Sequence, residues 1–277
     1  MRTMALLAVL VLSGCTSMFF FPDKRLVATP ADGGYDYRDV RIVTADGVAL
    51  HAWLLEPQGE ARGTVHFLHG NAENISTHTR AAAWLVDAGY RVLALDYRGY
   101  GLSEGTPDVP EVFEDIRASS EWLFDHVDAI GDEAPLYIFA QSLGASLAIR
   151  QLALEPEQRA RYSALMAEAA FTRYGHAAQH VARGSLLTWP FAWPARVLLR
   201  GPHDPLDAVP ALAPLPILFI HSEEDTIVPF EFGVALHAAA GEPKAFLPVT
   251  GPHVAAVREG TTRETMLAFM ATHAARR

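Results

Sequence analysis

Short apolar runs separated by polar segments rich in glycine and proline recur along the chain from about residue 40. The first two runs, Val40–Thr44 and Ala49–Leu55, alternate around Asp46-Gly47, which is a strong signal for a β-hairpin. The later runs are continuously apolar, as expected of strands buried on both faces of a sheet. We predict these strands at residues 64–68, 91–95, 136–139, 164–167, 217–220 and 244–247.

Helical spacing of apolar residues fills the intervals between these strands. An opening hairpin followed by alternating strands and helices predicts an α/β fold, with a mostly parallel sheet covered by helices on both faces. The alternation stops between residues 169 and 212, where we expect a short helical cap that contains the aromatic cluster Trp189–Trp193. The helices are predicted at residues 81–88, 112–127, 145–154, 232–239 and from 262 onward.

The N-terminus has the pattern of a secretion signal. Arg2 precedes the apolar run Ala5–Leu12, which is too short to span a hydrocarbon core of ~30 Å. Leu12-Ser13-Gly14-Cys15 follows and resembles the bacterial lipobox, in which cleavage leaves a lipid-bearing cysteine. We therefore predict a signal peptide over residues 1–14, lipidation of Cys15, a tether over 15–38 and a single α/β domain over 39–277. We expect the aromatic run Phe19-Phe20-Phe21 of the tether to lie near the membrane interface or to pack on the domain.

Composition narrows the function classes. Half of the 277 residues are hydrophobic, and the formal net charge is −10, which argues against a nucleic-acid partner. The single cysteine excludes an internal disulfide framework, and no Cys/His spacing resembles a zinc site. We expect no metal and no cofactor, and the sequence leaves the oligomeric state open.

The strand at 136–139 leads into the candidate nucleophile, Ser142. The segment Ala140-Gln141-Ser142-Leu143-Gly144 places small residues two positions before and two after the serine. Small residues there allow a sharp turn from strand to helix that exposes the serine hydroxyl. The alternative is a serine that caps the following helix.

An acid and a base follow two later strands. Asp225 lies just beyond the strand at 217–220, and His253 lies in a Gly/Pro turn beyond the last strand. Histidine can accept the serine proton, and a carboxylate can hold the imidazole in the correct tautomer. The order serine, acid, histidine is the one found in α/β-hydrolases. Glu168, after the preceding strand, is the alternative acid.

Two backbone N–H groups are candidates for an oxyanion hole. Asn71 ends the motif His69-Gly70-Asn71 after a buried strand, and Leu143 follows the serine directly. Among nearby polar residues, we expect His66, His69 and His221 to be structural and Glu223 and Glu224 to be solvated. We expect Asp96 and Arg98 to form an ion pair that fixes their Gly-rich loop, residues 96–101, and not to bind substrate.

These motifs together resemble the α/β-hydrolase-fold serine hydrolases, in the branch labelled serine aminopeptidase-like or monoacylglycerol-lipase-like. The resemblance runs from about Val40 to the C-terminus. It implies that Ser142 is the nucleophile, His253 the base and Asp225 the acid. Two positions depart from the family pattern: Ala140 replaces the usual glycine of the elbow, and Ser222 replaces the glycine that often follows the position of His221.

The sequence therefore predicts a serine hydrolase that cleaves a small-molecule carboxylic ester or thioester through an acyl-enzyme. Aminopeptidase-type amide hydrolysis is the alternative within the enzyme class, and a non-catalytic binding module is the alternative outside it. The aromatic cluster in the cap is either packing or a contact for an acyl chain. The lipobox implies a bacterial membrane, and Thr16 in place of Asp after Cys15 favours the outer membrane where the cell has one.

Overall fold

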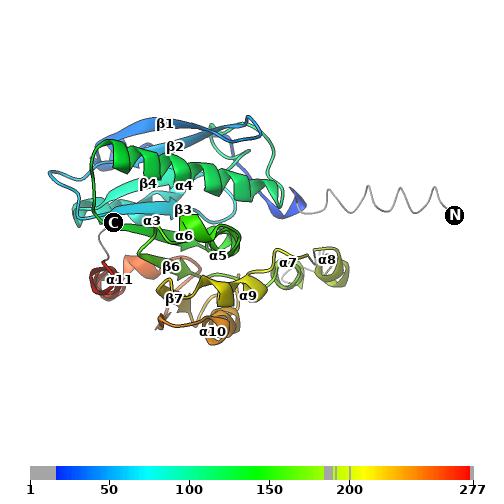
Figure 1. Cartoon of the computed structure of the whole chain (residues 1–277). Coiled ribbons are helices and arrows are strands. Elements are labelled where there is room, and N and C mark those ends of the chain that lie inside the picture. Colours follow the sequence, from blue (N-terminus) through cyan, green and yellow to red (C-terminus); the bar gives the residue numbers. More distant parts are fainter. Residues whose placement is uncertain (1–16, 184–189, 191, 200, 275–277) are drawn as a thin grey trace.

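The computed structural model describes residues 17–183, 190, 192–199 and 201–274 (Figure 1). Its centre is an eight-stranded sheet with the order β1-β2-β4-β3-β5-β6-β7-β8. The first two strands and β4 pair antiparallel, and all later neighbours are parallel. The strands are β1 (Tyr37–Val43), β2 (Ala49–Leu55), β3 (Thr64–Leu68), β4 (Arg91–Leu95), β5 (Leu136–Gln141), β6 (Ala164–Glu168), β7 (Ile217–Ser222) and β8 (Lys244–Val249).

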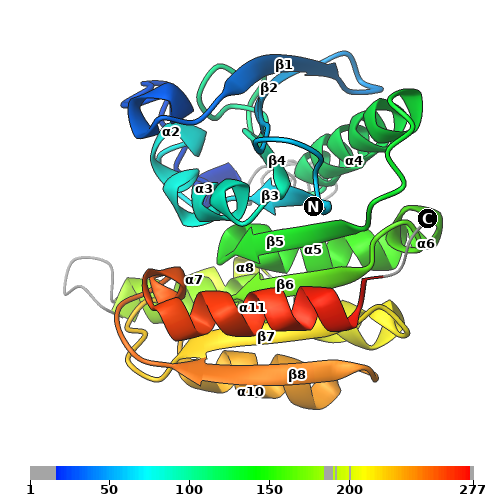
Figure 2. The ribbon, with the colours of Figure 1, turned by 90° about the vertical axis from the view of Figure 1, so that its left-hand side faces the viewer.

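Helices cover both faces of the sheet, as the alternating pattern predicted. One face packs against α3 and α11, which lie in front of the strands in Figure 2, and the other against α4, α5 and α10. The strand residues alternate between the two faces, so Val65 and Phe67 belong to one core and Leu68 to the other. The longer helices are α3 (Arg80–Asp87), α4 (Glu111–Ala129), α5 (Leu143–Leu154), α7 (Tyr174–Arg183), α8 (Ala192–Leu198), α10 (Phe230–Ala239) and α11 (Gly260–Thr272).

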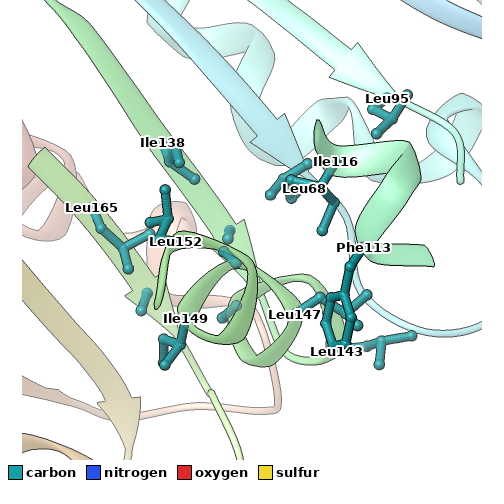
Figure 3. Packing of buried hydrophobic residues seen from close by; sticks show 14 of the residues in the cluster. Leu68, Leu95, Phe113, Ile116, Ile138, Leu143, Leu147, Ile149, Leu152 and Leu165 are labelled. Atoms are coloured by element: carbon teal, nitrogen blue, oxygen red, sulfur yellow. The ribbon is translucent and has the colours of Figure 1, made fainter. Parts of the chain in front are cut away.

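Helix α5 holds the centre of one core. Leu143, Leu147, Ile149 and Leu152 are at most 2% exposed and pack with strand residues and with Ile116 of α4 (Figure 3). Because nearly every side chain of this helix is buried, burial of apolar surface stabilises its position against the sheet. The first residue of this helix follows Ser142, so the same packing fixes the serine.

The predicted cap region contains helices in its described part. It holds α7 and α8, followed by the short helix α9 (Pro205–Ala208) and a 3₁₀ turn at Val209–Leu212. Trp193 is 71% exposed, so packing does not account for this residue. Trp189 and Phe191 lie outside the described residues. Within the described chain, no helix is both long and apolar enough to cross a membrane.

The segment expected to be a tether is packed against the domain from Ser17 onward. Phe20 is only 4% exposed, and Phe19 packs edge-on against Phe171 and Tyr174. Phe21, in contrast, is 62% exposed. Cys15 and the predicted signal peptide lie outside the described residues, so the lipid anchor stays a prediction.

Candidate active site

The candidate nucleophile stands in a strained turn between β5 and α5. Ser142 has φ of 52° and ψ of −113°, a backbone conformation that non-glycine residues rarely adopt. Its N–H donates to the Glu168 carbonyl oxygen at the end of β6 over 2.8 Å. The turn is held because β5 and α5 are both packed in the core. Such a strand-to-helix elbow presents the serine hydroxyl at the edge of the sheet.

The three candidate catalytic side chains lie together. The Ser142 hydroxyl is 3.0 Å from Nε2 of His253, and Nδ1 of His253 is 2.6 Å from Oδ2 of Asp225. A carboxylate only accepts hydrogen bonds, so Nδ1 carries the proton and Nε2 is free to accept from the serine. This orientation is what a general base at Ser142 requires.

The carboxylate of Asp225 is buried but supported. Burial by itself raises its pKa, but the hydrogen bond from His253 and those from the N–H groups of Val228 and Ile227 outweigh this effect. The net result is a pKa for Asp225 below the ordinary value of an aspartate. Asp225 is therefore ionised at neutral pH and can stabilise a positive charge on His253.

Glu168, the alternative acid, has other partners. Its carboxylate accepts from Nε2 of Gln141 and from the N–H of Ala256. Burial raises the pKa of Glu168. The Glu168 carboxylate thus links the end of β5 to the segment that follows His253. Asp225 is the carboxylate that contacts His253.

Two residues that the sequence did not single out for this purpose tie the loops of the site together. The hydroxyl of Ser222 donates to the Gly251 carbonyl oxygen, and the Glu224 carboxylate accepts from the Gly251 N–H. Both bonds join the loop that carries Asp225 to the loop that carries His253. Ser222 stands where the family often has glycine, and that departure was the only signal of its role. Glu224 is exposed, as expected, but it is not merely solvated.

The predicted oxyanion donors belong to the loop after β3, which carries Asn71, and to the first residue of α5, Leu143. Gly70 approaches the Ser142 side chain so closely that an added Cβ would lie 3.5 Å from the serine Cβ. In the described part of the chain, neither the Asn71 N–H nor the Leu143 N–H donates a hydrogen bond to the protein. The oxyanion role of both groups stays a prediction.

The three histidines near the site are bound to other groups of the protein. His66 contacts Tyr162 and Ser119, His69 donates to the Gly70 carbonyl oxygen, and His221 contacts the Val228 carbonyl oxygen, as expected of structural histidines.

The predicted pair between Asp96 and Arg98 is wrong. Arg98 instead binds Asp115 and Asp46, because Asp115 is fully buried on α4 and requires a cation. Asp96 accepts from the Ile75 N–H.

Comparison with known proteins agrees with this architecture. The family described as "Serine aminopeptidase, S33" matches residues 59–202. The chain belongs to this hydrolase family. The α/β-hydrolase is also 31% identical to the protein Rv2307c of Mycobacterium tuberculosis over 254 residues, which covers 88% of this chain and 85% of that protein.

More distant relatives share the fold. The protein Bem46 of Schizosaccharomyces pombe is 28% identical over 224 residues, covering 79% of this chain and 70% of its own. The solved structure of the Pyrococcus furiosus esterase Pf2001 superimposes with a TM-score of 0.76 at 22% identity, covering 92% of this chain and 98% of that one. At this identity, the esterase supports the α/β-hydrolase fold and not a particular substrate.

Proposed function

We propose that this α/β-hydrolase cleaves a carboxylic ester or thioester through an acyl-enzyme formed on Ser142. The continuous hydrogen-bond path from Ser142 through His253 to Asp225 is the observation that carries the proposal. In the first step, Ser142 Oγ attacks the acyl carbon while its proton passes to Nε2 of His253. The developing oxyanion is held by the N–H groups of Asn71 and Leu143.

The second half of the reaction uses the same residues. His253 returns the proton to the leaving alcohol or thiol, and the acyl group stays on Ser142 Oγ. A water molecule then gives a proton to Nε2 of His253 and attacks the acyl carbon. The bond between this carbon and Ser142 Oγ breaks, His253 returns the proton to Oγ, and the acid leaves. Ionised Asp225 stabilises the imidazolium in both halves.

The charges of the cap favour an ester over a peptide N-terminus. An aminopeptidase needs a carboxylate that holds the substrate ammonium group. Residues 169–212 contain only two carboxylates, Asp204 and Asp207, and both are ion-paired with Arg173 at 2.9 and 2.6 Å. Amide hydrolysis remains the alternative because the family takes its description from an aminopeptidase.

The proposal is tested by turnover of short p-nitrophenyl esters and of aminoacyl p-nitroanilides by wild type and S142A. We expect ester turnover by the wild type, a decrease of at least ~10³-fold in S142A, and little cleavage of the anilides. Faster cleavage of the anilides than of the esters would favour the aminopeptidase. Equal activity of S142A and wild type would contradict the role of Ser142, and an inactive wild type would favour the binding module.

We further propose that the enzyme is a bacterial lipoprotein anchored through Cys15, on the periplasmic side of the outer membrane where the cell has one. The lipobox-like segment before Cys15 supports this localisation. Expression with a labelled fatty acid should give a labelled wild-type protein that sediments with membranes. A C15S variant should carry no label and should lose the anchor. Equal labelling of the two proteins, or none in either, would contradict the proposal.

A further inference from the structure

We propose that residues 19–25, which we call the N-terminal clasp, position the oxyanion hole of this enzyme. The inference rests on the proposed function, because it assigns a role to the clasp through the N–H of Asn71. In Figure 1 the described N-terminal end lies at the same end of the sheet as α7 and α8. The clasp crosses the loop that follows β3, which carries Asn71, and reaches the cap through Phe19.

The loop after β3 needs outside support. Ala72 and Glu73 have φ of 63° and 57°, in the left-handed region that non-glycine residues seldom occupy. Such residues are strained and persist only when surrounding contacts hold them. The position of the Asn71 N–H therefore depends on what holds this loop from outside.

The clasp supplies these contacts to the side chain of Asn71 itself. The Phe21 N–H donates to Oδ1 of Asn71 over 3.0 Å, and Nδ2 of Asn71 donates to the Phe19 carbonyl oxygen over 2.6 Å. The hydroxyl of Tyr100 donates to the same Oδ1 over 2.7 Å. Both polar atoms of the Asn71 amide are thus bound, and its backbone N–H is left for the substrate.

Further bonds hold the clasp in register along the loop. The Asp23 N–H donates to the Glu73 carbonyl oxygen over 3.1 Å, beside a short parallel bridge between Pro22 and Glu73. Nδ2 of Asn74 donates to the carbonyl oxygens of Asp23 and Arg25. The Gly-rich loop after β4 is included, because the Gly101 N–H donates to the Asp23 carbonyl oxygen and Nζ of Lys24 donates to that of Ser103.

The contacts of Asn71 decide between a positioning role and a purely structural one. A segment that only adds stability could bind anywhere on the domain, but this one binds the side chain of Asn71, whose neighbour Gly70 lies against the Ser142 side chain. It makes no hydrogen bond to Ser142, His253 or Asp225 among the described residues. Loss of the clasp should therefore weaken stabilisation of the transition state and leave the base and the acid intact.

The test compares kcat and KM for one p-nitrophenyl ester in full-length variants. F21P removes the N–H that binds Asn71, and F21A is its matched control because it keeps that N–H and removes only an exposed ring. N71A removes the acceptor of this bond, together with the bonds of the Asn71 side chain to Phe19, Tyr100 and Ala72, and keeps the Asn71 backbone N–H. Y100F removes only the bond from Tyr100 and shows how much of the N71A effect comes from outside the clasp. We expect F21P and N71A each to lower kcat by ~10- to 100-fold, with KM changed less than ~3-fold. F21A should stay within ~2-fold of wild type in both constants.

The double variant makes the test specific. If Phe21 and Asn71 act through one contact, the kcat of F21P/N71A should be no lower than the kcat of the less active single variant. The pH profile of kcat/KM should keep its wild-type shape, because the pair of His253 and Asp225 is untouched. Urea unfolding of each variant identifies any that does not fold. If F21P fails to fold, the comparison of N71A with Y100F decides, because only N71A also breaks the bonds to the clasp; equal losses in the two would overturn the inference.

The outcomes separate this inference from the function on which it rests. An active wild type with F21P or N71A as fast as F21A would overturn the clasp and leave the hydrolase proposal intact. Losses that multiply in the double variant would overturn it as well. A wild type without turnover would overturn both proposals.

Discussion

Ser142 is held in its strained backbone conformation by the elements on either side. A left-handed φ at a serine is unfavourable, and the turn persists because β5 ends in the core and α5 begins there. The result is a hydroxyl on a residue that is only 8% exposed, within hydrogen-bond distance of His253. A flexible loop could not hold such a geometry.

His66 is a second residue whose surroundings determine its chemistry, and it predicts a pH dependence. Burial lowers its pKa from 6.5 to about 3, so the folded protein keeps this imidazole neutral over a range in which the unfolded chain protonates it. The unfolded state therefore binds more protons between pH ~3 and ~6.5, and stability is lost as the pH falls through that range.

We expect H66Q to reduce this loss of stability. The slope of the free energy of unfolding between pH 4 and 6 should fall by ~1.4 kcal/mol per pH unit, although H66Q will be less stable than wild type at pH 7. Urea unfolding at several pH values measures the slope. An equal slope in wild type and H66Q would contradict the account of His66.

The residue scale is also where sequence reasoning failed most clearly. Asp96 and Arg98 are two positions apart in a Gly-rich loop, which suggested a local pair. The buried Asp115 is on a different element, and the sequence contains no sign that it faces Arg98. Spacing along a chain finds local partners, whereas a buried charge selects its partner through the tertiary fold.

Among the elements, the close approach of α5 to β3 is the one that the site depends on. A Cβ added at Gly144 would lie 2.3 Å from the Leu68 carbonyl oxygen and 2.5 Å from that of His69. Both are backbone atoms, so they cannot rotate away. Gly144 therefore allows the first turn of α5, and with it the Leu143 N–H, to lie against the end of β3.

G144A should push α5 away from β3. We expect a loss of ~1–3 kcal/mol in the free energy of unfolding and a decrease in kcat of ~10-fold or more, because the Leu143 N–H would move with the helix. Urea unfolding and ester kinetics measure the two effects. G260A is the matched control, because the same added methyl at Gly260 would meet no atom within 4 Å. Wild-type stability and activity in G144A would contradict this account of the elbow.

The strands were predictable, and their last residues were not. Apolar runs correctly located the interior of β5, β6 and β7, but each strand continues into a buried polar residue: Gln141, Glu168 and Ser222. A prediction from hydrophobic patterning places the end of a strand at the last residue of the apolar run. These three residues are buried because their polar atoms find partners in the loops of the active site, and that pairing exists only in the folded chain.

In the whole molecule, the candidate catalytic residues come from loops spread over more than a hundred residues and meet at one edge of the sheet. Parallel strands make this possible, because the loops after their carboxyl ends gather at the same edge. The order of serine, acid and histidine was therefore enough to predict that they meet. Packing of the aromatic run on the domain was one of two expectations, but its contacts at this edge were not predictable, because the short segment 19–25 has no periodicity that shows what it contacts.

The most direct test of the central claim is covalent labelling of the full-length protein with a fluorophosphonate, followed by mass spectrometry of its peptides. The geometry of Ser142, His253 and Asp225 predicts one phosphonyl adduct, on Ser142, and no adduct in S142A. An adduct on another residue, or none on the folded wild type, would contradict the claim that Ser142 is the nucleophile.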